Sequence, residues 1–167
     1  WDILQLDTAG KITYGSYDDA TRMWKDSSVY GVKSISQYES AFGQDLNDDG
    51  HFGIDISQLT FSALDTSGLR LARDNDKALY IVTGAGSSAT AKAIGNAGWI
   101  ENSYDWGMGS NKKEAVAVEA LRDANNNIVS YKLALKQTST SNGVETVSWD
   151  ILKLDADAKV TYGSWDS

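Results

Sequence analysis

The 167-residue sequence contains no cysteine and no proline, and it has a single histidine. Without cysteine, the chain forms neither disulfide bonds nor thiolate metal sites. It also lacks a Cys–His pair and a Gly-x-Ser-x-Gly nucleophile elbow. Although there are 23 acidic residues, no pair of carboxylates stands out as a catalytic pair by its position. We therefore expect a protein that is not an enzyme.

Basic residues and long apolar runs are also scarce. No apolar run approaches the ~20 residues that a membrane-spanning helix requires, so we expect no membrane insertion. The 15 basic residues are outnumbered by 23 acidic ones, and the resulting net charge of −8 would repel nucleic-acid phosphates. We therefore expect no nucleic-acid partner. A chain of this length is large enough for one domain with a substantial core.

The segment 45–55, which reads Asp-Leu-Asn-Asp-Asp-Gly-His-Phe-Gly-Ile-Asp, has the donor spacing of a calcium loop. Asp45, Asn47 and Asp49 place side-chain oxygens at every second position, and a glycine follows where an EF-hand loop turns sharply. His51 stands at the position that contributes its backbone carbonyl. The pattern predicts a Ca²⁺ site with five ligands: Asp45, Asn47, Asp49, His51 and Asp55.

The end of this loop departs from the EF-hand pattern. An EF-hand carries a bidentate glutamate at position 12, where this chain has Ile56, and Asp55 lies one residue earlier. Either Asp55 closes the calcium shell or a carboxylate from elsewhere in the chain does. The alternative is a surface turn without an ion, because aspartate, asparagine and glycine favour turns in any case.

A short helix is predicted before the loop and β-structure after it. Ser34 and Gln37 form a capping box, and the helix should end near Gly43. Its apolar stripe would be Val32, Ile35, Tyr38 and Phe42. Later residues alternate between β-prone runs and turns, which predicts hairpins of 69–73 with 78–83 and of 115–122 with 128–137, then a polar loop at 138–143. The predicted fold class is α+β, mainly β: antiparallel hairpins with one short helix leading into an EF-hand-like calcium loop.

The first nineteen residues return at the end of the chain. Residues 149–167 match residues 1–19 at an offset of 149 − 1 = 148, and twelve of the nineteen aligned positions are identical. This indicates a tandem array, with residues 1–148 forming one calcium-binding β-rich module. Residues 149–167 would then be the first hairpin of the next repeat, or a segment that pairs with another subunit. In the alternative interpretation, the two hairpins are equivalent halves of a pseudo-symmetric fold.

The chain resembles the tryptophan-rich domain found at the C-termini of large secreted and surface proteins of cyanobacteria. The resemblance is carried by Tyr38-Glu-Ser-Ala-Phe42 running into the Asp45–Gly53 loop, and by Trp1 with Asp7 and Trp149 with Asp155. Val118-Glu119, which leads to the run 131–135, is similar to the glutamate-bearing hairpin of that family, but the tryptophan usual there is missing. The resemblance implies an extracellular module and no enzymatic activity.

These observations favour a structural repeat module of a secreted or cell-surface bacterial protein, adhesin-like or filament-forming, that associates with neighbouring copies. An acidic, cysteine-free chain with a calcium loop suits a calcium-rich extracellular medium. The alternative is a carbohydrate-binding module with glycan ligands, for which exposed rings would be sought at Trp24, Trp99 and Trp106. A dockerin-like module is disfavoured because it would carry two such loops. We expect the remaining tryptophans to lie in the core: Trp1, Trp149 and Trp165.

Overall fold

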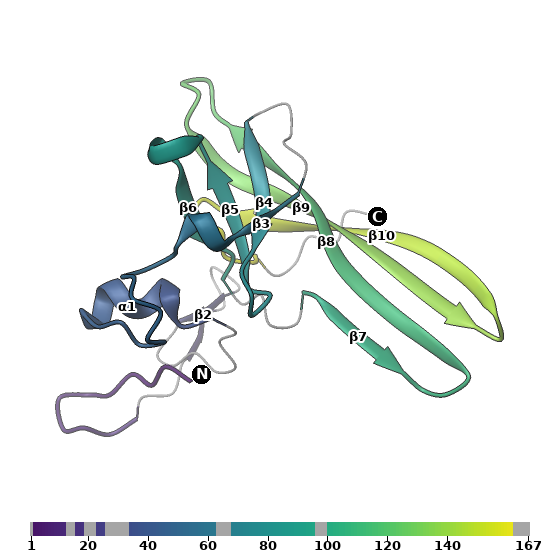
Figure 1. Cartoon of the computed structure of the whole chain (residues 1–167), viewed down its shortest axis with the longest axis horizontal. Helices are drawn as coiled ribbons and strands as arrows, with labels where there is room; N and C mark the ends of the chain where they lie inside the picture. The colour runs from purple at the N-terminus through teal and green to yellow at the C-terminus, as the bar shows by residue number, and fades with distance from the viewer. Residues whose placement is uncertain are drawn as a thin grey trace.

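The structure is a computed structural model that describes residues 2–12, 16–18, 23–25, 34–62, 68–95 and 100–161, with the backbone alone for 16–18 and 23–25. Within them the fold is mainly antiparallel β with one short helix, which confirms the predicted class at that level (Figure 1). One four-stranded sheet has the order β3 (Thr60–Phe61), β4 (Leu69–Arg73), β5 (Leu79–Thr83), β6 (Thr90–Ala93). The other has the order β10 (Val144–Asp155), β9 (Ile128–Ser141), β8 (Gly109–Arg122), β7 (Asn102–Asp105). A two-stranded sheet joins β1 (Ser16–Asp18) to β2 (Met23–Lys25).

Four hairpin turns in the described chain share one local design. In each, the N–H of an aspartate donates to the carbonyl of the residue four positions later, and the aspartate carbonyl accepts the N–H of the residue three positions later. The aspartate carboxylate also accepts the N–H of the residue four positions later. The residue three positions later has a positive φ, as in a turn closed by a bulge. The aspartate and positive-φ pairs are Asp7 with Gly10, Asp74 with Lys77, Asp123 with Asn126, and Asp155 with Ala158. Both predicted central hairpins are confirmed by β4–β5 and β8–β9.

The polar loop predicted at 138–143 is wrong. Strand β9 continues to Ser141, and Asn142 and Gly143 alone connect it to β10. Their φ angles are 49° and 77°, the paired positive values of a type I′ turn. Asn-Gly is the dipeptide that best tolerates both angles, so the serines and threonines before it remain in the strand.

Helix α1 spans Ser36–Phe42 and ends as predicted at Gly43, whose φ of 63° closes the last turn. The predicted capping box is wrong: Ile35 is the N-cap residue, and the Gln37 side chain donates to the carbonyl of Ser34. The predicted apolar stripe is confirmed at Ile35, which is buried, and wrong at Phe42, which is exposed; Val32 lies outside the described residues. The buried residue within the helix is Glu39. The helix therefore directs a carboxylate inward.

The main core lies between the two four-stranded sheets. Its residues come from β4 and β5 on one side and from β8, β9 and β10 on the other; they include Leu71, Ile81, Val118, Leu133 and Leu154. A second cluster covers the opposite face of β4 and β5 and contains Leu59, Ala72, Ala78, Tyr80 and Val82. Strand β5 is therefore buried on both faces. In the described part of the chain, no helix has the length and apolar character needed to cross a bilayer.

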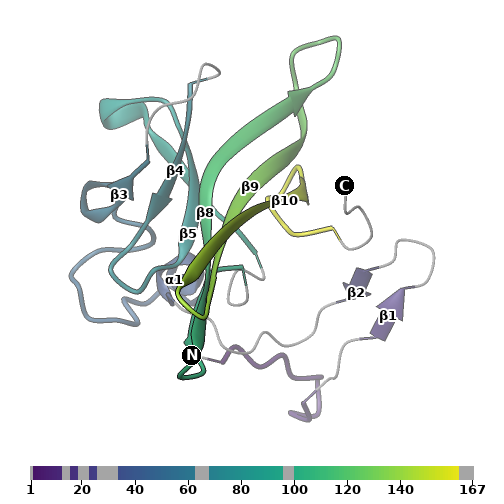
Figure 2. The same ribbon diagram turned by 90° about the vertical axis from the view of Figure 1, so that its right-hand side faces the viewer.

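The C-terminal hairpin links the edges of the two sheets. Beyond β10 the chain turns back, so that Val160 pairs antiparallel with Leu154, and Lys159 forms a parallel bridge with Gly95. Gly95 follows edge strand β6, and its N–H donates to the carbonyl of Ala158 over 3.0 Å. The hairpin, yellow in Figure 2, thus leaves edge strand β10 and contacts the edge of the second sheet.

The β7–β8 turn, the β9–β10 turn and the strand residues next to these turns project from the core as an arm (Figure 1). Trp149, expected in the core, lies on this arm with 61 % of its surface exposed, so that prediction is wrong. Successive side chains of a strand point to opposite faces. Leu152 and Leu154 are the buried residues of β10, so Trp149, at an odd position, points to the other face. Trp106, one of the tryptophans named above as candidates for an exposed ring, is exposed. The side chains of Trp1, Trp24, Trp99 and Trp165 lie outside the described residues.

Candidate metal loop and adjoining pocket

The first half of the predicted calcium loop forms a tight bend around Asp45. One oxygen of its carboxylate accepts the N–H of Gly50 over 2.8 Å, and the other accepts the N–H of Asp49 over 3.2 Å. Gly50 has a φ of 82°, a conformation in which a side chain would be strained, and Asp48 has a φ of 59°. A carboxylate that receives two N–H groups stabilises this bend locally.

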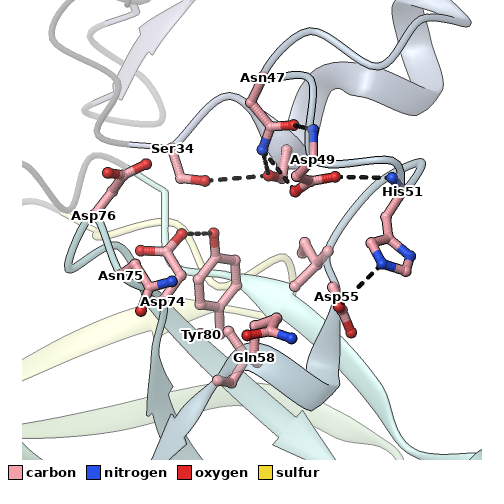
Figure 3. A pocket seen from close by; sticks show the side chains of 13 residues that line it. Ser34, Asn47, Asp49, His51, Asp55, Gln58, Asp74, Asn75, Asp76 and Tyr80 are labelled. Carbon is pink, nitrogen blue, oxygen red and sulfur yellow. Dashed lines mark hydrogen bonds and ion pairs between the residues drawn. The ribbon is translucent and has the colours of Figure 1, made fainter.

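Asn47 and Asp49 lie side by side on this bend (Figure 3). The Asn47 amide nitrogen donates to one Asp49 carboxylate oxygen over 2.8 Å, and the other Asp49 oxygen accepts the N–H of His51 over 2.8 Å. The same amide nitrogen also donates to the hydroxyl of Ser36, the first residue of α1, over 3.1 Å. The predicted donors are therefore close together and tied to the start of the helix.

Glu39 holds the loop at two points, a role that was not predicted from the sequence. Its carboxylate is fully buried, and its two oxygens accept the N–H of Leu46 over 3.1 Å and the N–H of Gly53 over 2.9 Å. A buried carboxylate needs such donors, and here they come from both sides of the bend. The available signal was its spacing: Glu39 lies four residues after the apolar Ile35, on the helix face that was expected to be buried.

The structure does not place Asp55 beside the Asp45 bend. One Asp55 oxygen caps a short 3₁₀ helix, η1 (Ile56–Gln58), by accepting the N–H and the hydroxyl of Ser57 over 2.9 and 2.7 Å. The other lies 3.5 Å from the Nε2 atom of His51. The hydrogen bonds from Ser57 lower the pKa of Asp55, with a smaller contribution from His51. Asp55 is thus an ionised group at the far end of the loop.

A pocket of about 300 Å³ lies between this loop and the β4–β5 turn (Figure 3). Four predicted metal ligands line the loop side: Asn47, Asp49, His51 and Asp55. The opposite side carries Asp74, Asn75 and Asp76 of the turn, with Tyr80 behind them. Four carboxylates from two distant parts of the chain therefore line one pocket.

Tyr80 anchors the far wall of the pocket. Its hydroxyl donates to the Asp74 carboxylate over 2.7 Å, and Asp74 also accepts the N–H of Ala78. Burial raises the pKa of Tyr80 well above its usual value, so the hydroxyl keeps its proton and acts as a donor. Asp74 is therefore oriented by two donors, and Asp76 lies two residues further along the same turn.

The donor chemistry of the bend fits a hard cation, since Asp45, Asn47 and Asp49 offer oxygen atoms, the ligands that such ions prefer. Among the described residues, no three acidic, histidine or cysteine side chains are close enough together to form a metal-binding group by themselves. The bend therefore supplies two carboxylates and one amide. Further oxygens would have to come from backbone carbonyls, water, or another carboxylate on the pocket.

The sequence matches no protein-family model, and neither curated proteins nor solved structures show a significant match to it. The resemblance to tryptophan-rich domains therefore stays a prediction based on the motifs quoted above.

Proposed function

We propose that this chain is a calcium-stabilised structural repeat module of a secreted or cell-surface bacterial protein, in which neighbouring copies associate in an adhesin-like or filamentous array. The observation that carries the proposal is the bend at 45–50. There the Asp45 carboxylate closes the turn, and Asn47 lies within 2.8 Å of the Asp49 carboxylate. The module has no catalytic role in this proposal.

Electrostatics supports a cation at this place. Asp49 and Asp55 from the loop and Asp74 and Asp76 from the turn line the same pocket, so their charges repel one another across it. When bound, a divalent cation would neutralise part of this charge and connect the helix–loop segment to the β-sheet. Asp45, Asn47, Asp49 and the carbonyl of His51 would hold it. Asp55, or a carboxylate of the opposite turn, would complete the shell.

The repeated hairpin supports the array. The two copies of the repeated sequence form hairpins with the same turn, so the repetition extends from sequence to local structure. An ordinary single domain has no need of two such segments at an offset of 148 residues, whereas a chain of tandem modules would contain one per module. The boundary of the module, placed at residue 148 from the sequence, stays part of this proposal.

Thermal unfolding in millimolar Ca²⁺ and in EDTA tests the calcium part. At a calcium concentration of about 100 Kd the expected gain is about 2.7 kcal/mol, because the ion binds only the folded chain. For a chain of this size that corresponds to a rise in Tm of about 5–10 °C. Asp49→Asn should remove most of the rise. Asp123→Asn is the control, because the Asp123 carboxylate also accepts backbone N–H groups in a turn but does not line the pocket.

A Tm that is the same in calcium and EDTA would exclude the metal assignment. If calcium does stabilise the chain, Asp55→Asn and Asp76→Asn identify the carboxylate that completes the shell. The variant that weakens calcium affinity more, measured by isothermal titration, has lost a ligand. The other should bind calcium almost as tightly as the natural chain.

A carbohydrate-binding role is the second candidate, and one observation favours it. Tyr104 and Trp106 are exposed, and their ring centroids lie 5.5 Å apart at the turn of the arm. Trp106 lies against Gly109, where an added Cβ would come within 2.6 Å of the indole ring. Flat exposed rings held in place can stack on sugar faces. A glycan panel titrated by tryptophan fluorescence, with Trp106→Ala as control, would detect such binding.

A further inference from the structure

The two copies of the repeated sequence have the same hairpin geometry. In the first copy, the Asp7 carboxylate accepts the N–H groups of Ala9 and Lys11, each over 2.9 Å. In the second, the Asp155 carboxylate accepts those of Asp157 and Lys159, again each over 2.9 Å. The flanking antiparallel bridges, Leu6 with Ile12 and Leu154 with Val160, also correspond. The first copy is thus already folded into the shape of the second.

The two copies differ in what covers them. In the C-terminal copy Leu152 is 5 % exposed and Leu154 is fully buried, because the hairpin packs into the core between the sheets. Their N-terminal equivalents, Leu4 and Leu6, are 46 % and 53 % exposed. Figure 1 shows the purple N-terminal hairpin at the lower left, clear of both four-stranded sheets. The first copy therefore leaves about half exposed the two leucines whose equivalents the second copy buries.

The substitutions between the copies preserve the side-chain volume that the core site requires. Gly10 replaces the buried Ala158 and removes one methyl group, while Ile12 replaces the buried Val160 and adds one methylene. The total number of side-chain carbons at the two positions is unchanged. Volume-conserving apolar exchanges of this kind are the ones that packed cores tolerate best.

The turn of the first copy is also well suited to the core position that the second copy occupies. Ala158 has a φ of 61°, a conformation that costs free energy in any residue with a Cβ, whereas Gly10 adopts a φ of 77° without that cost. Lysine occurs in both copies at the position that bridges Gly95, as Lys11 and Lys159. The backbone contact with the edge of the second sheet therefore stays possible for the first copy.

From these observations we infer that the Asp2–Ile12 hairpin is a docking element, which binds in a second copy of this chain at the core site filled here by the Leu152–Val160 hairpin. The inference rests on the proposed repeat function and specifies its contact: one module donates a hairpin that completes the core of the next. Leu4 and Leu6 would enter the core, and Lys11 would bridge Gly95 of the receiving copy. Where the receiving copy's own hairpin fills the site, the two compete.

The test uses the full chain carrying Leu6→Asp and Leu154→Asp, which disables both of its own hairpins, and a fluorescent peptide of residues 1–18 as the probe. We expect the peptide to bind this variant at least tenfold more tightly than it binds the natural chain, whose site is filled. We also expect it to raise the Tm of the variant. A peptide with Leu4→Asp and Leu6→Asp is the matched control and should do neither.

The inference is overturned if the natural and control peptides bind the variant equally well. It is also overturned if the natural peptide binds the variant no more tightly than the natural chain, or does not bind the variant at all. Should the double variant fail to fold alone, folding on addition of the natural peptide and not of the control supports the inference, and no folding with either contradicts it. A variant with Leu6→Asp and Leu154→Ala allows the same comparison and should destabilise the core less.

A second measurement concerns self-association. The full chain with Leu154→Asp alone keeps an intact N-terminal hairpin, so it should form concentration-dependent oligomers in sedimentation velocity, and adding Leu6→Asp should return it to monomer. Oligomers that persist in the double variant would contradict the inference. All measurements are made in calcium and in EDTA. Peptide binding without calcium stabilisation would reject the metal assignment alone, and calcium stabilisation without peptide binding would reject the docking hairpin alone.

Discussion

Leu6 and Leu154 occupy equivalent positions in two hairpins of nearly the same sequence, yet Leu6 is half exposed and Leu154 is fully buried. Both hairpins have the same turn, the same flanking bridge and the same carboxylate hydrogen bonds. The comparison separates two properties that usually occur together. A short segment determines its own turn, but it does not determine whether its apolar face is covered.

The two copies differ in burial because the second copy begins within a long strand, and that strand pairs with its neighbour along its whole length. Strand β10 pairs with β9 from Val144 to Asp155, and this pairing carries Leu152 and Leu154 into the core. Within the described residues, neither four-stranded sheet includes the first copy as a strand. The same side chains therefore contribute differently to the stability of the chain, which substitution at matched positions can measure.

The largest contrast is expected at the matched leucines. Leu154→Ala should lower the free energy of unfolding by about 2–5 kcal/mol, because it leaves a cavity in a packed core. Leu6→Ala should change it by no more than about 0.5 kcal/mol in dilute solution, as for other exposed positions. Urea unfolding followed by fluorescence measures both. Equal losses at the two positions would show that both hairpins are packed within one molecule.

A smaller contrast is expected at the turn aspartates. Asp155→Ala removes two hydrogen bonds from N–H groups in a packed hairpin and should cost about 1–2 kcal/mol. Asp7→Ala removes the same two bonds from the hairpin that is not packed, so global stability should hardly change. The local effect of Asp7→Ala should instead appear as faster amide hydrogen exchange at Lys11. If Asp7→Ala lowers global stability as much as Asp155→Ala, the two hairpins do not differ in their coupling to the core.

The smallest effect is expected at the positive-φ positions. Ala158→Gly relieves about 1 kcal/mol of backbone strain but loses a buried methyl group worth about 0.8 kcal/mol, so the net change should be close to zero. Gly10→Ala introduces the strain without any gain in packing and should reduce protection of the N-terminal turn in hydrogen exchange. A clear stabilisation by Ala158→Gly would show that strain outweighs packing in the buried copy.

The turns were the most predictable part of the fold. Two β-prone runs on either side of a polar turn predicted the hairpins at Asp74 and Asp123, and both are confirmed. Local preference alone was not sufficient everywhere. The Asn142-Gly143 turn was overlooked because the polar residues before it were interpreted as a loop, although they pair along β9 and β10.

The candidate site was predictable in part. The spacing of Asp45, Asn47 and Asp49 identified the loop, and the structure brings these side chains together on one bend. The buried Glu39 clamp and the facing carboxylates on the β4–β5 turn were missed. Their relation to the loop depends on how a helix and a distant hairpin pack, which residue spacing along the chain does not encode.

The sequence by itself determined what depends on neighbours within about five residues: the aspartate turns, the end of the helix at Gly43 and the bend at Gly50. Their hydrogen bonds close over a few bonds of chain and need no partner element. Only the tertiary structure decided which hairpin is buried, why Trp149 faces solvent and which carboxylates share the pocket. Burial depends on strand pairing between distant segments, so the same residues can be core in one place and surface in another.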